Sequence, residues 1–86
     1  MQAVTVSTGI TLLAKRSLLR NGVMIQASED NDFYVSFIGD TNLSASNGFL
    51  IEAGTPPFYF SSNNRAIGPI YGIVGSGQAV VKIEEI

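Results

Sequence analysis

The most constraining feature of this chain is a series of about seven short apolar runs, separated by glycine, asparagine and proline. Short runs bounded by such turn formers at a spacing of about 8–12 residues are typical of a β-sandwich or a small barrel. The length of 86 residues allows one domain. We therefore predict one all-β domain over residues 1–86, a small β-sandwich or jelly-roll-like barrel of about seven short antiparallel strands.

The clearest local pattern lies at residues 22–39. Two runs of alternating side chains, 23–28 and 33–38, are joined by the polar residues 29–32. This pattern predicts a β-hairpin. The same alternation assigns inward positions to Phe33, Val35, Phe37, Phe49, Ile51, Phe58, Phe60, Val81 and Ile83.

Two segments near the N-terminus leave alternatives open. Residues 10–18 fit a short amphipathic helix as well as a strand, and the neighbouring pattern favours the strand. Residues 1–8 are either an edge strand of the domain or an extended arm that pairs with another chain, with Val4 and Val6 as contact residues. Gly9 would let such an arm swing away from the domain.

Charged residues make up only 14% of the chain, against about 25% in a typical soluble domain. Cysteine is absent, so no disulfide stabilises this small domain, and association is the remaining route. We therefore expect a homo-oligomer, and specifically a trimer. The predicted contact residues are apolar positions on outward faces: Met24, Tyr34, Ile38, Leu50, Tyr59 and Val80. The competing interpretation is that a second sheet or loop covers these positions.

The residue inventory argues against catalysis. Histidine and cysteine are both absent, and serine nucleophiles usually need a histidine or lysine base. Asp32, Asp40 and Glu52 remain formal candidates for a carboxylate pair, but such a small sandwich leaves little room for a cleft. The acidic segment 29–32 lacks the spacing of a calcium loop, and the glycines 72, 75 and 77 do not follow the dinucleotide-binding order. We predict no enzyme activity, no cofactor and no metal site.

Charge and hydropathy also restrict the partners. A net charge of −2 and five scattered cations provide no basic patch for nucleic acid. No apolar run approaches the roughly 18 residues of a membrane-spanning helix, and the first residues lack the pattern of a signal peptide. We expect neither a nucleic acid nor a membrane partner, and synthesis in the cytoplasm. Tyr34, Tyr59 and Tyr71 provide a stacking platform only as a less favoured alternative to core and interface packing.

Four segments of the chain resemble small virion proteins of tailed bacteriophages. They are residues 23–26, 32–37, 43–54 with Asn47-Gly48, and 70–83 with Gly75-Ser76-Gly77. The resemblance extends from about Arg20 to Glu85, and the segment Gly54-Thr55-Pro56-Pro57 departs from the pattern.

This resemblance implies a non-catalytic structural role in the virion. The expected function is that of a capsid decoration or cement protein, with itself and the major capsid protein, or another virion protein, as partners. A tail, neck or fibre-base component is one alternative. A carbohydrate-binding module is another, and it would need an exposed aromatic platform with polar neighbours.

Overall fold

The computed structural model of the protein describes residues 2–17, 22–26, 29–36, 42–44, 46–61 and 68–85, with only the backbone at 58, 60 and 61. These residues form eight strands and no helix, which confirms the predicted all-β class. The strands are β1 (Gln2–Val6), β2 (Thr11–Ala14), β3 (Gly22–Gln26), β4 (Phe33–Ser36), β5 (Phe49–Ile51), β6 (Phe58–Ser61), β7 (Ile70–Ile73) and β8 (Ala79–Glu85).

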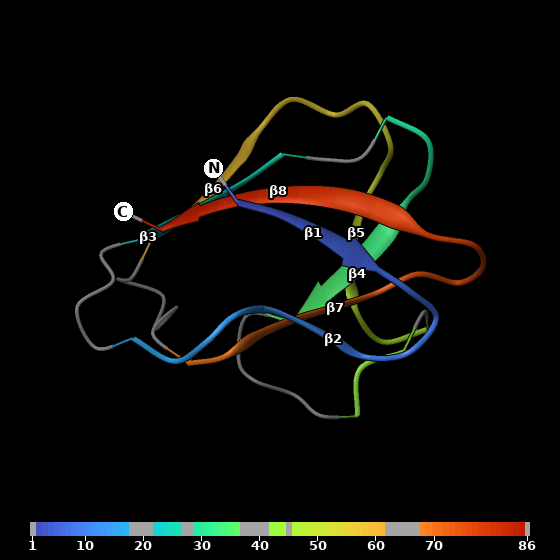
Figure 1. Ribbon diagram of the computed structural model, residues 1–86, viewed down its shortest axis with the longest axis horizontal. Coiled ribbons are helices and arrows are strands. Elements are labelled where there is room, and N and C mark those ends of the chain that lie inside the picture. The colour runs from blue at the N-terminus through green and yellow to red at the C-terminus, as the bar shows by residue number, and fades with distance from the viewer. Residues whose placement is uncertain are drawn as a thin grey trace.

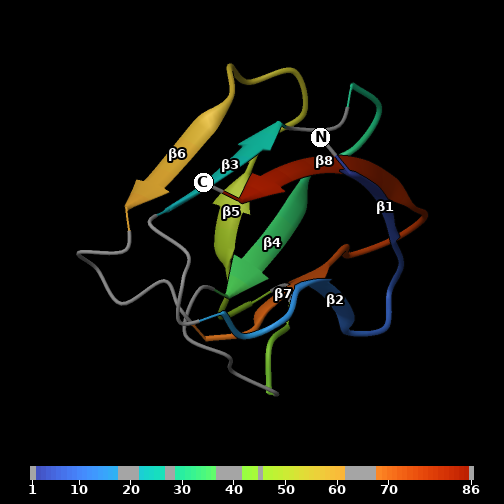
Figure 2. The same cartoon turned by 60° about the vertical axis from the view of Figure 1, so that its left-hand side comes forward.

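The strands form two antiparallel sheets that pack as a sandwich (Figure 1). Sheet A has the order β1-β8-β3-β6, and sheet B has the order β2-β7-β4-β5. Figure 2 shows the two layers, with each strand of sheet A facing a sequence neighbour in sheet B: β1 and β2, β8 and β7, β3 and β4, β6 and β5. Eight antiparallel strands in two such sheets correspond to a jelly roll, the second of the two predicted forms.

The predicted hairpin over residues 22–39 is wrong. β3 pairs with β6 and β8 in sheet A, whereas β4 pairs with β5 and β7 in sheet B. The polar residues 29–32 therefore cross from one sheet to the other. Asn31 supports the crossing, because its Nδ2 donates to the backbone oxygens of Ser76 and Gln78, at 2.7 and 3.3 Å. The segment between β7 and β8 also crosses between sheets.

The core lies between the sheets and draws on both. β8 illustrates the alternation, since Ala79, Val81 and Ile83 are buried while Val80, Lys82 and Glu84 are exposed. Burial of each Val, Ile or Phe side chain contributes about 1.5–3 kcal/mol. The buried cluster contains Val6, Leu13, Ala14, Val23, Ile25, Phe33, Val35, Ile51, Ile70, Val74, Ala79, Val81 and Ile83.

One predicted core residue is exposed. Phe49 pairs with the buried Val35 and lies on the same side of sheet B, yet 53% of its surface is accessible. β5 is the edge strand of sheet B, so Phe49 has a strand on one side only. Five predicted inward positions are buried as expected: Phe33, Val35, Ile51, Val81 and Ile83. Phe37 and the side chains of Phe58 and Phe60 lie outside the described residues.

The N-terminal segments are both strands. Gln2–Val6 pairs with β8 in regular register, and Val6 is fully buried, so the segment is an edge strand of its own domain. Of the two alternatives for residues 10–18, a strand or a short helix, the structure shows a strand at Thr11–Ala14, which pairs with β7. A register shift between Leu12 and Ala14 turns both Leu13 and Ala14 into the core. That irregularity explains why simple alternation was ambiguous here.

Candidate interaction surface

The apolar residues predicted to face outward are divided between the two sides of the sandwich. Met24, Tyr59 and Val80 lie on the outer face of sheet A. Tyr34 and Leu50 lie opposite each other on the outer face of sheet B. Ile38 is outside the described residues. The predicted set therefore does not form one patch.

The two residues predicted for the N-terminal arm have different positions. Val4 is partly buried and packs against the core from the inner side of β1. Val6 has no accessible surface and belongs to the core itself. Only Val4 is therefore placed where a second chain can reach it.

The outer face of sheet A is mixed in character. Lys82 and Glu84 are exposed on β8, the second strand of the sheet. Gln26 of β3 pairs with Lys82, and Met24 pairs with Glu84. Val80 and Tyr59 are 52% and 51% exposed, but charged and polar neighbours separate them. Scattered apolar residues of this kind are normal on a soluble surface.

The outer face of sheet B is mainly apolar, and we call it the apolar face. Leu12 of β2 lies opposite Tyr71 of β7, and Tyr34 of β4 lies between Ile73 and Leu50. Ile10 lies just before β2 and two residues before Leu12, so an extended backbone places both side chains on the same face. The apolar face thus comprises Ile10, Leu12, Tyr34, Leu50, Tyr71 and Ile73.

The apolar face crosses all four strands of sheet B without a charged residue within them. Ile10, Leu12 and Leu50 are 41%, 48% and 42% exposed, and the other three side chains are partly exposed. Ser36, the polar residue opposite Tyr71, is only 8% exposed. A contiguous apolar surface of this kind is a candidate site for contact with another molecule.

A short loop lies against the edge of the apolar face. Leu43 is buried but stands outside the main core cluster. A Cβ atom at Gly48 would come within 2.7 Å of both Leu43 Cδ1 and Tyr34 Cβ, so these residues pack closely. The loop is held by Asn47, whose Oδ1 accepts from the Ser44 amide at 2.7 Å. The Asn47-Gly48 pair therefore serves the loop that borders Tyr34.

Sequence reasoning missed four members of the apolar face. Ile10 and Leu12 lie in the segment for which a strand and a helix were both open, and Ile73 was included only within the segment 70–83. Tyr71 was considered only with the other tyrosines. The alternation in the sequence shows which residues of a strand share a side. It does not show to which sheet the strand belongs, because strand order depends on pairing between distant segments.

Three of the residues considered for catalysis, metal binding or a phosphate loop have structural roles: Asp32, Gly72 and Gly77. Asp32 Oδ1 accepts a hydrogen bond from the Ala53 amide at 2.7 Å, which joins the start of β4 to the end of β5. Gly77 has a φ of 72° in the turn before β8, and Gly72 lies close to Leu13 in the core. Asp40 is outside the described residues. Among the described residues no group of three or more acidic, His or Cys side chains is placed to hold a metal ion.

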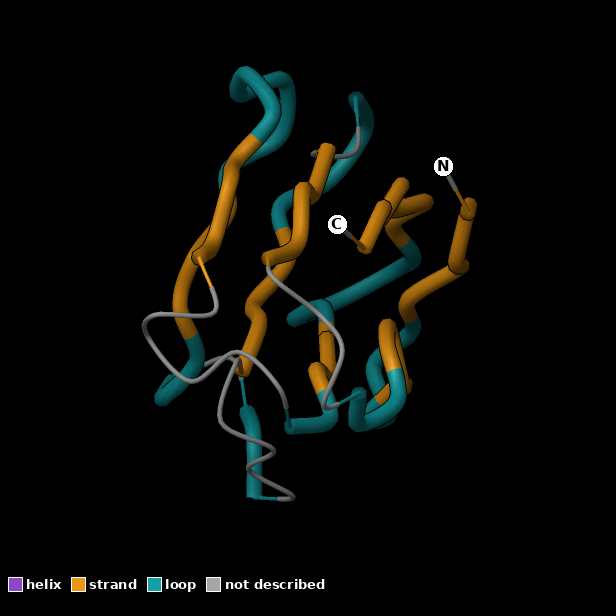
Figure 3. Tube along the Cα trace, turned by 90° about the vertical axis from the view of Figure 1, so that its left-hand side faces the viewer, coloured by secondary structure: helices purple, strands orange, loops and turns teal. Residues whose placement is uncertain are grey.

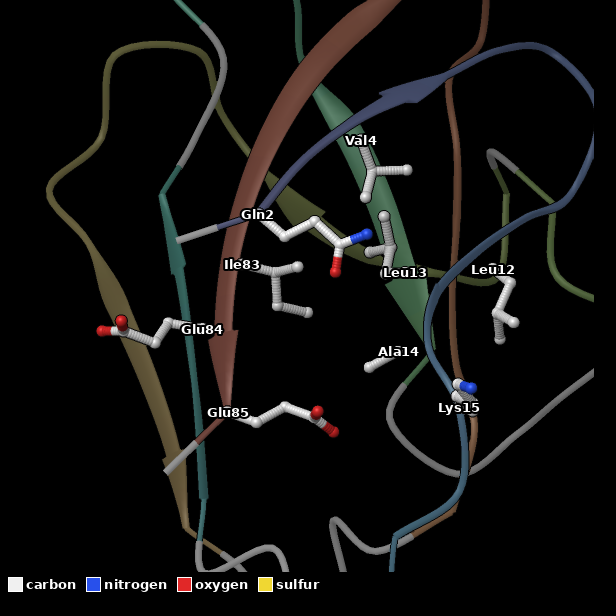
Figure 4. Close-up of a pocket in the computed structure, with 9 residues that line it drawn as sticks. All are labelled: Gln2, Val4, Leu12, Leu13, Ala14, Lys15, Ile83, Glu84 and Glu85. Carbon is white, nitrogen blue, oxygen red and sulfur yellow. The ribbon is translucent and has the colours of Figure 1, made fainter.

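An opening of about 450 Å³ lies between the two sheets on the side of β1 and β2 (Figure 4). Val4 and Ile83 from sheet A and Leu13 and Ala14 from sheet B provide its apolar walls. The Gln2 side chain extends into it in Figure 4. Leu12, Lys15, Glu84 and Glu85 complete the lining.

Comparison of the chain with protein-family models, with curated proteins and with solved structures finds no match. Within the described residues, no helix has the length and apolar character needed to cross a membrane. The fold and its surfaces therefore carry the functional argument.

Proposed function

We propose that this protein is a non-catalytic structural protein of a tailed-phage virion, a capsid decoration protein that binds the outer capsid surface. The apolar face of sheet B is the contact surface for the major capsid protein. The observation that carries this proposal is the continuous, uncharged outer surface over β2, β7, β4 and β5, opposite a charged outer surface on sheet A. We expect such a difference between the two faces in a protein that binds its partner through one face and exposes the other to solvent.

The physical requirements of a decoration protein fit the chain. Such a protein contributes interface area and needs no reactive group. Removing a leucine side chain from water stabilises an interface by about 1.5–3 kcal/mol before association costs. Leu12 and Leu50 stand near opposite edges of the apolar face, so together they test most of its width.

The location of the protein is tested by labelling intact particles with an antibody against this chain. Labelling distributed over the capsid supports decoration. Labelling confined to the tail or neck contradicts capsid decoration and favours the tail-component alternative. Absence of the protein from purified particles contradicts a virion role altogether.

The contact face is tested by adding purified variants to capsids that lack the protein. Leu12→Glu combined with Leu50→Glu should weaken capsid binding at least 100-fold while the circular dichroism spectrum stays unchanged. Val80→Glu combined with Met24→Glu, on the outer face of sheet A, is the matched control and should change affinity less than threefold. The reverse pattern would show that sheet A provides the contact.

A further inference from the structure

β1 is the best-formed free edge among the described strands. The four edge strands are β1 and β6 in sheet A and β2 and β5 in sheet B. β2 contains a register shift, β5 has only three residues, and β6 follows Pro56-Pro57. β1 pairs regularly with β8 over all five of its residues, and it contains no charge and no proline. Natural proteins usually block such an edge, because its unpaired backbone groups attract another strand.

The opening described above lies directly beside this edge. Val4 faces the opening from β1, and Leu13 and Ala14 face it from β2 (Figure 4). A strand added to β1 would place alternate side chains over these apolar walls, because alternate residues of neighbouring strands share a face. The free backbone edge and the opening therefore lie side by side, and one added strand would contact both.

We propose that a second copy of this chain occupies the β1 side of the sandwich. The β1 strands of the two copies pair antiparallel about a twofold axis that passes beside Val4, the middle residue of Gln2–Val6. The two sheets A become one continuous eight-stranded sheet, and the two openings close on each other. The two Val4 side chains then meet across the axis.

Three observations favour a second copy over an unrelated chain. An antiparallel edge is self-complementary under a twofold axis, since the same donors and acceptors face each other. The absence of charge in β1 removes like-charge repulsion between identical strands.

The third observation is the size of the surface. The shortest dimension of the molecule, 17 Å, runs across the strand order, so the β1 side presents an outline bounded by 33 × 26 Å (Figures 1 and 3). This outline is the upper limit for a flat contact on the β1 side, and it is large enough to contain a standard interface, in which each partner buries about 800 Å².

This pairing produces a dimer and no larger assembly, because each copy has one free β1 edge and the pair uses both. A dimer therefore takes the place of the trimer expected from the sequence. The apolar face of sheet B remains uncovered in this dimer except at Leu12, which also lines the opening, so self-association and capsid binding use largely separate surfaces. The inference does not depend on the proposed function.

Single cysteines test the register, since the natural chain contains none. Residues directly opposite in an antiparallel pair have Cα atoms about 4.5–5.5 Å apart, within the range that a disulfide spans. Val4→Cys should form a disulfide-linked dimer under mild oxidation. In the same register the two Gln2 positions are separated by roughly 13 Å along the strands, so Gln2→Cys should remain at least tenfold less cross-linked, as should Val80→Cys.

Sedimentation tests the association without a cross-link. The unmodified protein between 1 µM and 1 mM should show a monomer–dimer equilibrium. Gln2→Lys directs a charge into the opening and should raise the dissociation constant at least tenfold, while Val80→Lys should leave it within twofold. Circular dichroism checks that each variant is folded.

Four results would overturn the proposal. They are a folded monomer at 1 mM, association that Gln2→Lys does not weaken, a trimer, or equal cross-linking of Val4→Cys and Gln2→Cys. None of these results bears on whether the apolar face binds capsids, which Leu50→Glu alone tests away from the opening.

Discussion

The two outer faces of this sandwich are built on one core but differ in what they offer to their surroundings. Sheet A displays Lys82, Glu84 and Gln26 between its exposed apolar residues. Sheet B displays leucine, isoleucine and tyrosine on all four strands. The difference shows that strand alternation fixes only which side of a sheet is buried. Whether the side chains on the opposite side are polar or apolar depends on whether solvent or another molecule contacts that side.

The largest expected effect on stability comes from a substitution in the core between the two sheets. Phe33 is fully buried at the start of β4, next to Tyr34 on the apolar face. Phe33→Ala should lower the free energy of unfolding by about 3–5 kcal/mol, because it leaves a cavity in the core. Urea denaturation measures this loss. A loss below about 1 kcal/mol would mean that the two sheets are not held together through this contact.

A smaller effect is expected where the loop borders the apolar face. Gly48→Ala places a methyl group within 2.7 Å of Leu43 Cδ1 and Tyr34 Cβ, which should destabilise the domain by about 1–3 kcal/mol through overpacking. Thermal unfolding provides the measurement. Gly68→Ala is the matched control, since a Cβ there meets no atom within 4 Å. Equal stability of the two variants would contradict the close packing at Gly48.

The smallest effect compares one cross-strand pair from each face. Met24 lies opposite Tyr59 on sheet A, and Tyr34 lies opposite Leu50 on sheet B. Double-mutant cycles to alanine should give favourable coupling of about 0.2–1 kcal/mol for each pair. Similar values would show that the faces differ in their outward chemistry but not in how their strands are paired. A coupling confined to one pair would contradict that view.

Much of the fold was readable from local patterns. Short alternating runs located the strands, and β8 shows the predicted alternation of buried and exposed residues. The link between β3 and β4 was not readable, because a polar segment of this length suits a hairpin and a crossing equally well. What selects the crossing includes the bonds from Asn31 to Ser76 and Gln78. These partners are distant in the sequence.

The candidate surface was predictable only in part. Alternation correctly placed Tyr34 and Leu50 on an outward face. It also grouped them with Met24, Tyr59 and Val80, which lie on the other sheet. Phe49 shows a second limit. It lies on the inward side of β5, but β5 is an edge strand and Phe49 is exposed. Such errors arise from strand order, which local periodicity does not encode.

The strand order also has a consequence for how the chain folds during synthesis. β8 comes last in the sequence but lies between β1 and β3 in sheet A. The first and third strands to leave the ribosome therefore have no permanent neighbour on that side until the last one emerges. Pairings between such distant segments are slow to form, on a scale of milliseconds to seconds for all-β domains. We expect the nascent chain to stay open to chaperones and proteases until β8 inserts and completes sheet A, although all four strands of sheet B have emerged by the end of β7.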